Sequence, residues 1–542
     1  MTRAGTIRGS CRAVVATLSV GLALGCDARG SSAGARDDRR TGAPTGGDGL
    51  PAAVATATAL PVRATSASRG AVAEQTFRFG AFGLVHVLHA GAAPLAGTAP
   101  AHTVVFASGD GGWDANAAQI ARRIAGSGDV LVLGVDSKTY LAQTGRGRGC
   151  AFPAGDFEAL SQYTQHRLGV ARYTPPVLVG HSSGAALVYA TLAQAPRGTF
   201  PGAVALGLCA GTSSPRPFCG ASRRPPLGAR RRGGFVLLPD TALRLPVTVL
   251  RPTAEDDDCP LAGVQRFVQA TPGAELVTVP GGHLFATADW LPAFTRALDR
   301  AAPPQPALAE RASGAAAAAR VDASVADLPL VQIAPAAAAG GPSDLVAVVL
   351  SGDGGWASID REVGETLAAA GVPVVGLNTL QYFWTPRTPD GAGADLARLV
   401  AHATSAPPGG GPPRPRVVLV GYSRGADVLP FMARRLPPEL RARVAAVALL
   451  GLESSIAFEF HVSDWLGGSA SDERPTLPEV AALRAILPPA VPVLCLYGSG
   501  EDDSACPAAA RQGGARAIAM PGGHHLGGDY PALARQILAA VH

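Results

Sequence analysis

Residues 417–425 read Val-Val-Leu-Val-Gly-Tyr-Ser-Arg-Gly, an apolar run that leads directly into a Gly-x-Ser-x-Gly pentapeptide. Uninterrupted apolar runs are typical of parallel strands that are buried on both faces. The small residues of the pentapeptide allow a sharp, strained turn that lifts a serine hydroxyl clear of the backbone before a helix begins. Because residues 426–435 look helical, the stretch predicts an α/β-hydrolase arrangement with Ser423 as the nucleophile.

Three motifs recur in the same order in the two halves of the chain: a glycine loop, the serine pentapeptide and a Pro-Gly-Gly-His sequence. They are Ser108–Trp113, Gly180–Gly184 and Pro280–His283 in the first half, and Ser351–Trp356, Gly421–Gly425 and Pro521–His524 in the second. The histidine follows the serine by 101 residues in both halves, from 182 to 283 and from 423 to 524. Chance matches to short patterns would not produce this spacing, which indicates two related domains with serines at Ser182 and Ser423.

Length and the order of apolar runs predict the fold class. The chain has 542 residues, which leaves room for two cores of roughly 200 residues each. In each half, short apolar runs alternate with helix-like segments, as expected for a parallel sheet covered by helices. We therefore predict two tandem α/β-hydrolase-like domains, each a mostly parallel sheet flanked by helices, over residues 76–300 and 344–542. An Ala/Pro-rich linker over residues 301–343 joins them.

The N-terminus predicts export. Arginines precede an uncharged stretch at residues 13–25 and Cys26, so residues 1–26 read as an export signal. The stretch is too short to span a bilayer, which takes about 20 residues. Leu22-Ala-Leu-Gly-Cys26 resembles a bacterial lipobox, with alanine where leucine is usual. We predict a periplasmic protein that is lipid-anchored through Cys26, or alternatively soluble or held by the uncleaved segment. Residues 27–75 read as a flexible tether.

Cysteine and charge usage narrow the functional class. Cys495 and Cys506 can pair only with each other in the second domain, and the four cysteines of the first domain allow three pairings. Disulfides persist in the compartment that export would reach. No cysteine and histidine spacing of a zinc site is present, so we expect no metal and no cofactor. The net charge of +5 is scattered without a basic patch, which disfavours nucleic acid as a partner.

Each serine needs a histidine within hydrogen-bond reach, because the hydroxyl is a weak nucleophile until a base removes its proton. His524 and His283 end the two Pro-Gly-Gly-His motifs. We predict that the first serves Ser423 and the second serves Ser182. His525 is the weaker candidate, because it has no counterpart in the first half.

The carboxylate that orients each histidine is expected at the end of the preceding strand. Acidic loops, Glu501-Asp-Asp503 and Glu255-Asp-Asp257, follow apolar runs at these places. Adjacent carboxylates usually form a solvated loop, and only one in each loop can face the histidine. We predict Asp502 or Asp503 in the second domain, without choosing between them, and Asp256 in the first.

The glycine loops are candidates for one half of an oxyanion hole. In this architecture the loop supplies one backbone amide, and the residue after the nucleophile supplies the other. We predict Gly352 or Asp353 with Arg424 in the second domain, and Asp110 with Ser183 in the first. An alternative for Asp353 and Asp110 is that their side chains brace the turn. A phosphate-binding loop is disfavoured, because no Gly-Lys-Ser/Thr follows.

These motifs resemble those of the VirJ family of bacterial virulence proteins, and the duplication is similar to its two-domain AcvB-type members. The segments that carry the resemblance in the second half are Ser351–Trp356, Leu377–Trp384, Arg387–Pro389, Gly421–Gly425, Phe458–Trp465, Glu501–Pro507 and Pro521–His525. The first half has no clear counterpart of Phe458–Trp465. The resemblance implies an exported hydrolase that releases lysine or alanine from aminoacylated phosphatidylglycerol at the outer face of the inner membrane.

An aminoacyl ester carries an ammonium group, and carboxylates follow the apolar run 444–450. Glu453, Glu459 and Asp464 are therefore candidate substrate-binding residues, with solvated surface carboxylates as the equal alternative. Two other functions stay open: a general exported esterase or peptidase, and a periplasmic adaptor that binds secreted proteins or a secretion system. The presence of serine, acid and histidine in both halves favours an enzyme.

Overall fold

The structure is a computed structural model, and it describes most of the chain after residue 71. The described residues are 72–91, 95–146, 150–209, 211–212, 214–219, 227–231, 234–254, 259–303, 325–336, 344–405, 407–410, 412–459 and 472–541. The predicted export signal, Cys26 and nearly all of the predicted tether lie outside these ranges. Within them, no helix combines the length and the apolar character needed to cross a membrane.

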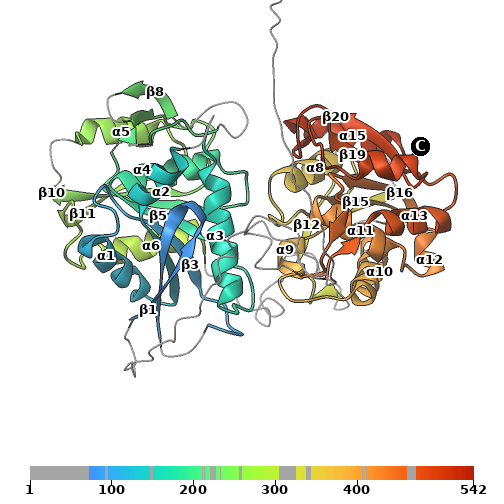
Figure 1. The fold of residues 1–542 in the computed structure, drawn as a ribbon, viewed down its shortest axis with the longest axis horizontal. Coiled ribbons are helices and arrows are strands. Elements are labelled where there is room, and N and C mark those ends of the chain that lie inside the picture. The colour runs from blue at the N-terminus through green and yellow to red at the C-terminus, as the bar shows by residue number, and fades with distance from the viewer. Residues whose placement is uncertain are drawn as a thin grey trace, which may run out of the picture. The chain divides into compact units, whose positions relative to one another are not determined.

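The first domain is built on an eight-stranded sheet (Figure 1). Its strands are β1 (Val72–Phe79), β2 (Gly83–Ala90), β3 (His102–Ala107), β4 (Val130–Val135), β5 (Val177–His181), β6 (Ala203–Leu206), β10 (Val247–Ala254) and β11 (Ala274–Gly282). They run in the order β1-β2-β4-β3-β5-β6-β10-β11. The six strands from β4 to β11 are parallel to one another, and β2 pairs antiparallel with both β1 and β4.

The second domain repeats this plan with seven strands. They are β12 (Leu330–Ile333), β13 (Leu345–Leu350), β14 (Val374–Leu377), β15 (Arg416–Tyr422), β16 (Val444–Leu450), β19 (Val493–Gly498) and β20 (Arg516–Met520). Their order is β12-β14-β13-β15-β16-β19-β20, and all pairs are parallel except β12 with β14. The predicted fold class, a mostly parallel sheet in each of two domains, is confirmed.

Helices cover both faces of each sheet (Figure 1). In the first domain they are α1 (Ala115–Ala125), α2 (Ser137–Thr144), α3 (Pro153–Arg167), α4 (Ser183–Gln194), α5 (Leu261–Gln269) and α6 (Leu291–Ala301). In the second they are α8 (Ser358–Ala369), α9 (Thr379–Tyr382), α10 (Pro389–Ser405), α11 (Arg424–Ala433), α12 (Pro438–Arg441), α13 (Leu477–Ile486), α14 (Cys506–Arg511) and α15 (Tyr530–Ala539). Two small sheets complete the described fold, β7 (Gly211–Thr212) with β8 (Leu227–Arg231) and β9 (Gly234–Leu237), and β17 (Ser455–Ile456) with β18 (Arg474–Pro475).

The apolar runs are continuous because the central strands are buried on both sides. In β13, Val346 and Val348 belong to the core cluster that includes α10 and α11. The alternate residues, Ala347 and Val349, belong to the cluster that includes α8 and α15. Successive side chains of a strand point to opposite faces, so every position of such a strand must be apolar.

The tryptophan that ends each glycine loop packs on a glycine of the neighbouring strand. A Cβ atom on Gly376 of β14 would lie 2.1 Å from the Trp356 ring, and one on Gly134 of β4 would lie 2.0 Å from the Trp113 ring. No side chain fits in that space. Both domains therefore anchor the loop that begins at the end of β13 or β3 in the same way.

Two predicted boundaries differ from the structure. The strand β12 lies inside residues 301–343, which we predicted as a linker, and it pairs with β14 as the edge of the second sheet. The strand β1 begins at Val72, inside the predicted tether. Both strands are antiparallel edge strands, which carry a weaker apolar signal than the buried parallel strands of the centre.

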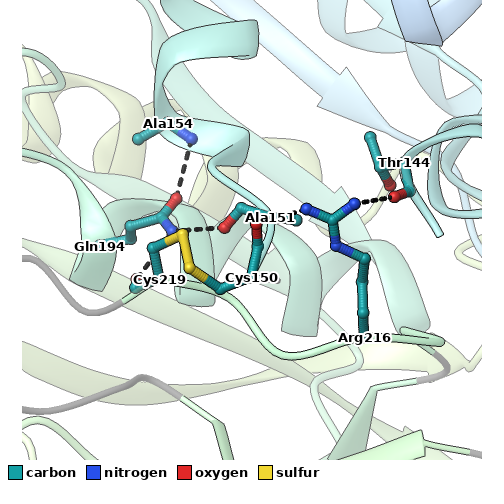
Figure 2. Close-up of a disulfide and its surroundings, with 7 residues drawn as sticks. All are labelled: Thr144, Cys150, Ala151, Ala154, Gln194, Arg216 and Cys219. Atoms are coloured by element: carbon teal, nitrogen blue, oxygen red, sulfur yellow. Dashed lines mark hydrogen bonds between the residues drawn. A yellow bond between two sulfur atoms is a disulfide. The ribbon is translucent and has the colours of Figure 1, made fainter. Parts of the chain in front are cut away.

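The disulfides follow the predicted pattern and add the pairing that the sequence left open. Cys495 pairs with Cys506 as predicted, and the first domain pairs Cys150 with Cys219 and Cys209 with Cys259. Figure 2 shows Gln194, at the end of α4, beside the Cys150–Cys219 disulfide. Its amide nitrogen donates to the carbonyl oxygens of Ala151 (2.9 Å) and Cys219 (2.8 Å). The disulfide is therefore tied to the helix that follows Ser182.

Candidate active site

The predicted nucleophile turn is present in both domains. Ser423 has φ 51° and ψ −123°, and Ser182 has φ 55° and ψ −119°. Non-glycine residues rarely adopt a positive φ, and such strain is typical of functional positions. A Cβ atom on Gly421 would lie 2.3 Å from the Gly425 carbonyl oxygen. The two glycines of the pentapeptide are thus required for the strand and the helix to approach each other.

The second domain places a glutamate against the predicted base. His524 Nδ1 lies 2.5 Å from Glu501 Oε1. The other carboxylate oxygen of Glu501 accepts a hydrogen bond from the Gly498 amide at 2.6 Å, at the end of β19. The Glu501 side chain is only 9% exposed, whereas the His524 side chain is 35% exposed, so the carboxylate is buried and the imidazole stays accessible.

The predicted orienting acids are therefore wrong in the second domain. Asp502 and Asp503 are exposed, and Glu501 makes the contact with His524. The turn after β19 directs the first acidic residue inward, because the Glu501 amide donates to the Gly498 carbonyl oxygen at 3.0 Å. Glu501 differs from the other two acids only in being the nearest to the strand end, and the prediction did not use this difference.

The His524 ring lies at the strand ends that flank Ser423. A Cβ atom on Gly451, just after β16, would be 2.8 Å from His524 Cε1. The Ser423 amide donates to the carbonyl oxygen of Leu450, the last residue of β16, at 2.8 Å. The Tyr422 and His524 ring centroids are 5.4 Å apart. The fold thus brings the predicted serine and histidine, 101 residues apart in sequence, to one edge of the sheet.

His525 has a different environment from His524. Its Nδ1 lies 3.4 Å from the Tyr422 hydroxyl, and burial together with the neighbouring His524 lowers its pKa. Glu501 bonds to His524 and not to His525. Of the two adjacent histidines, the geometry favours His524 as the base.

The glycine loop offers Asp353 rather than Gly352 as an oxyanion donor. The Gly352 amide already donates to Asp360 Oδ2 at 3.3 Å, so it is engaged within the protein. Asp353 Oδ1 accepts a hydrogen bond from the Gly354 amide at 2.9 Å, which is the bracing role considered as an alternative. Arg424 begins α11, where the helix dipole favours negative charge, and its side chain donates to the Ala457 carbonyl oxygen at 3.0 Å.

Two buried carboxyl groups lie beneath this site, and neither was predicted from the sequence. Asp360 is 3% exposed and Asp427 is 2% exposed. Asp360 accepts from Gly352 in the glycine loop, and Asp427 Oδ1 accepts from the Glu453 amide at 2.8 Å. Burial raises the pKa of both groups well above the usual range. Counting from the aligned motifs, alanines (Ala117 and Ala186) stand at these places in the first domain.

The candidate substrate carboxylates are only partly brought to the site. Glu453 follows β16. Partial burial raises its pKa, and the nearby His524 lowers it. The charges of Asp353 and Asp503 raise the pKa further. Glu459 is half-buried, and its carbonyl oxygen accepts from Arg424 at 3.5 Å. Asp464 lies outside the described residues. Glu453 is therefore the predicted carboxylate that shares the electrostatic environment of His524.

The first domain repeats the turn with different contacts. The Ser182 hydroxyl donates to Asp110 Oδ2 at 3.4 Å, an interaction that we did not predict. A Cβ atom on Gly207 would lie 2.9 Å from His283 Cε1, which matches the Gly451 and His524 arrangement. Ser183 begins α4, as Arg424 begins α11. The predicted Asp256 lies outside the described residues.

The Cys495–Cys506 disulfide closes the loop that carries Glu501. Both cysteines are fully buried, and they lie in β19 and at the start of α14. We expect a C495A/C506A variant to lose about 2–3 kcal/mol of unfolding free energy, as is usual for short loops. We also expect kcat to fall, because Glu501 is no longer held. Urea unfolding and ester hydrolysis measure the two effects.

A C150A/C219A variant is the matched control, because that disulfide belongs to the first domain. It should lose stability while kcat of the second domain stays unchanged. An unchanged kcat in C495A/C506A would contradict the role assigned to the loop closure.

Comparisons with known proteins agree with this description. The family model described as Bacterial virulence protein (VirJ) matches residues 101–210 and 344–542. Carboxylesterase Culp1 of Mycobacterium tuberculosis is 40% identical over 80 residues, which are 15% of this chain and 31% of the relative. The chain thus spans about a third of the length of this curated relative.

Two solved structures are similar to part of this chain. Est1E from Butyrivibrio proteoclasticus is 13% identical with a TM-score of 0.28, and the match covers 39% of this chain and 91% of that one. XC6422 from Xanthomonas campestris, described as an a/b serine hydrolase without lid, is 17% identical with a TM-score of 0.26. That match covers 39% of this chain and 87% of the other.

Proposed function

The chain belongs to the VirJ family of bacterial virulence proteins, and from this we propose that its second domain is a serine ester hydrolase. We propose that it cleaves the aminoacyl ester of lysyl- or alanyl-phosphatidylglycerol. The observation that carries the proposal is the Glu501 and His524 pair at 2.5 Å, beside the strained turn of Ser423. A short match to a carboxylesterase supports the same reaction class.

The proposed reaction uses a serine, histidine and glutamate triad. His524 Nε2 takes the Ser423 proton as the oxygen attacks the ester carbonyl, while Glu501 holds the Nδ1–H and stabilises the imidazolium. The amides of Asp353 and Arg424 hold the tetrahedral oxyanion. The glycerol oxygen then leaves with the proton from His524. Water, activated by the same histidine, releases the amino acid from Ser423 and restores the hydroxyl.

The charges around the site support an aminoacyl substrate. Burial raises the pKa of Glu453, the nearby His524 lowers it and the charge of Asp353 raises it, so Glu453 lies close enough to His524 for their charges to interact. The α-ammonium group of an aminoacyl ester lies two bonds from the reacting carbonyl carbon, which places it within reach of a carboxylate near the serine. Asp427 fixes the backbone of Glu453 at 2.8 Å, so this carboxylate starts from a rigid position.

The proposed location follows from the substrate. Aminoacylated phosphatidylglycerol is a membrane lipid, and an exported enzyme would meet it at the outer face of the inner membrane. An anchor at Cys26 would keep the domain near this surface, since a lipid-linked chain remains at the bilayer. Purified mature protein, incubated with a mixed lipid extract, should remove lysyl- or alanyl-phosphatidylglycerol and leave phosphatidylglycerol. Mass spectrometry of the lipids measures this, and an unchanged aminoacyl-lipid pool would overturn the proposal.

Replacing Glu453 with glutamine tests the substrate preference. We expect E453Q to lower kcat/KM for a lysyl ester about tenfold, because hydrogen bonds to charged groups contribute about 1.5–3 kcal/mol. Hydrolysis of the matching acetyl ester, which has no ammonium, should not change. The control is E439Q, an exposed glutamate on α12. Equal losses on both esters would show that Glu453 does not recognise the ammonium.

The same assay separates the competing functions. A general esterase would hydrolyse the acetyl ester as well as the lysyl ester and would ignore E453Q. A periplasmic adaptor would hydrolyse neither. The Glu501 and His524 pair beside the strained turn of Ser423 supports a hydrolase over an adaptor.

A further inference from the structure

A cavity of about 300 Å³ in the second domain gathers two motifs that the proposed chemistry does not use. One is Arg387-Thr-Pro389, and the other begins at Phe458. The residues that line the cavity are Arg387, Thr388, Pro389, Asp390, Arg435, Phe458, Asp472 and Arg474. Three of these eight residues carry a guanidinium group, which suggests a site for an anion.

The guanidinium groups differ in how they are neutralised. Arg435 Nε lies 2.5 Å from Asp390 Oδ1, and this pair lowers the pKa of Asp390. Arg387 stacks over the Tyr382 ring at 4.6 Å, and its Nε donates to the Tyr382 carbonyl oxygen at 3.2 Å. Among the described residues, no carboxylate oxygen lies within 4.0 Å of Arg387 or Arg474. The cavity therefore holds two guanidinium groups without a bonded carboxylate, although Asp472 also lines it.

The cavity adjoins the segment that contacts the nucleophile turn. The Arg387 amide donates to the Phe458 carbonyl oxygen at 3.0 Å. The preceding residue, Ala457, accepts from Arg424, which follows Ser423 directly. The two-residue segment 457–458 thus contacts the serine turn on one side and the cavity on the other. A ligand in the cavity would contact Phe458, whose neighbour Ala457 bonds to Arg424 of the candidate active site.

We propose that this cavity binds the phosphodiester of the lipid head group while the aminoacyl ester occupies the serine site. The proposal rests on the proposed function. In aminoacyl-phosphatidylglycerol the phosphodiester and the aminoacyl ester are attached to the same glycerol, so a site for one beside a site for the other matches the substrate. The planar fork of an arginine pairs with phosphate oxygens through two parallel hydrogen bonds. Arg387 is already held in place by the Tyr382 ring, which reduces the entropy lost on binding.

The test is an R387Q/R474Q variant compared with R511Q/R535Q. The control removes the same charge from exposed arginines of α14 and α15. Two substrates are used, lysyl-phosphatidylglycerol in detergent micelles and lysyl-glycerol, which has no phosphate. For R387Q/R474Q we expect KM for the lipid to rise about tenfold or more with kcat nearly unchanged. Hydrolysis of lysyl-glycerol should be unaffected, and the control should match the unmodified protein on both substrates.

Calorimetric titration with glycerophosphoglycerol tests binding without catalysis. We expect binding by the unmodified protein and by R511Q/R535Q, and its loss in R387Q/R474Q. Binding of inorganic phosphate as tight as that of glycerophosphoglycerol would overturn the assignment to a head group, and so would equal binding by all variants. If arginine-dependent binding is seen but no aminoacyl-lipid is hydrolysed, the proposed function fails and the anion site stands.

Discussion

Replacing Ser423 with alanine will abolish ester hydrolysis, with a loss in kcat of about 10⁶-fold, because no other group can form the covalent intermediate. Ser423 is 9% exposed and lies in the strained turn, so alanine removes one oxygen atom with little change in packing. The measurement is release of lysine from lysyl-phosphatidylglycerol by purified protein. Circular dichroism of the variant should match that of the unmodified chain.

The matched control is S182A, which makes the same change in the first domain. We expect at most a small effect, since alanines replace both buried acids there and Asp110 engages the serine. A large loss of kcat in S182A would place the catalytic centre in the first domain. Full activity in S423A would show that Ser423 is not the nucleophile. The pair of variants therefore assigns the activity to one of the two similar turns.

Replacing Glu501 with glutamine should lower kcat by about 10⁴-fold, which is the usual effect of converting the triad acid to its amide. The amide keeps the shape of the side chain, but it can donate to His524 Nδ1 and favour the wrong tautomer. It also leaves the imidazolium without a countercharge. Steady-state kinetics on the lysyl ester measures the loss.

D502N and D503N are the controls from the same loop, and both should keep kcat within about twofold because these side chains face solvent. A large loss of kcat in D502N or D503N, with Glu501→Gln fully active, would show that the acid predicted from the sequence orients the histidine. Each of the three variants replaces a carboxylate of the loop with the corresponding amide and removes one negative charge. A loss seen only in Glu501→Gln is therefore due to the contact with His524 and not to the change in loop charge.

The serine turn was predictable because it depends on a short local pattern. The turn at Ser423 needs glycines at Gly421 and Gly425, and those glycines are visible in the sequence. The histidine was found by its equal spacing in two copies. The orienting acid was not found, because three adjacent carboxylates have the same local pattern and only the hydrogen bond between Glu501 and Gly498 selects one of them.

The buried acids show a second kind of failure. Asp360 and Asp427 lie in helices, where an isolated acid usually faces solvent. In this fold they face inward, and each accepts a hydrogen bond from the loop after a different strand. No periodicity marks such a residue, since its partner is a backbone amide far along the chain. The only sequence signal for these residues is that the first copy has alanine where the second has an acid.

The sequence by itself determined that the chain repeats one α/β unit, and where the serine turn lies between a strand and a helix in each copy. It could do so because continuous apolar runs and the placement of glycines are visible over a few residues. The tertiary structure alone decided which carboxylate meets His524, which acids are buried beneath the loops, and which arginines share a cavity. Those outcomes depend on how loops after separate strands approach one another, and that approach is set by packing across the whole sheet.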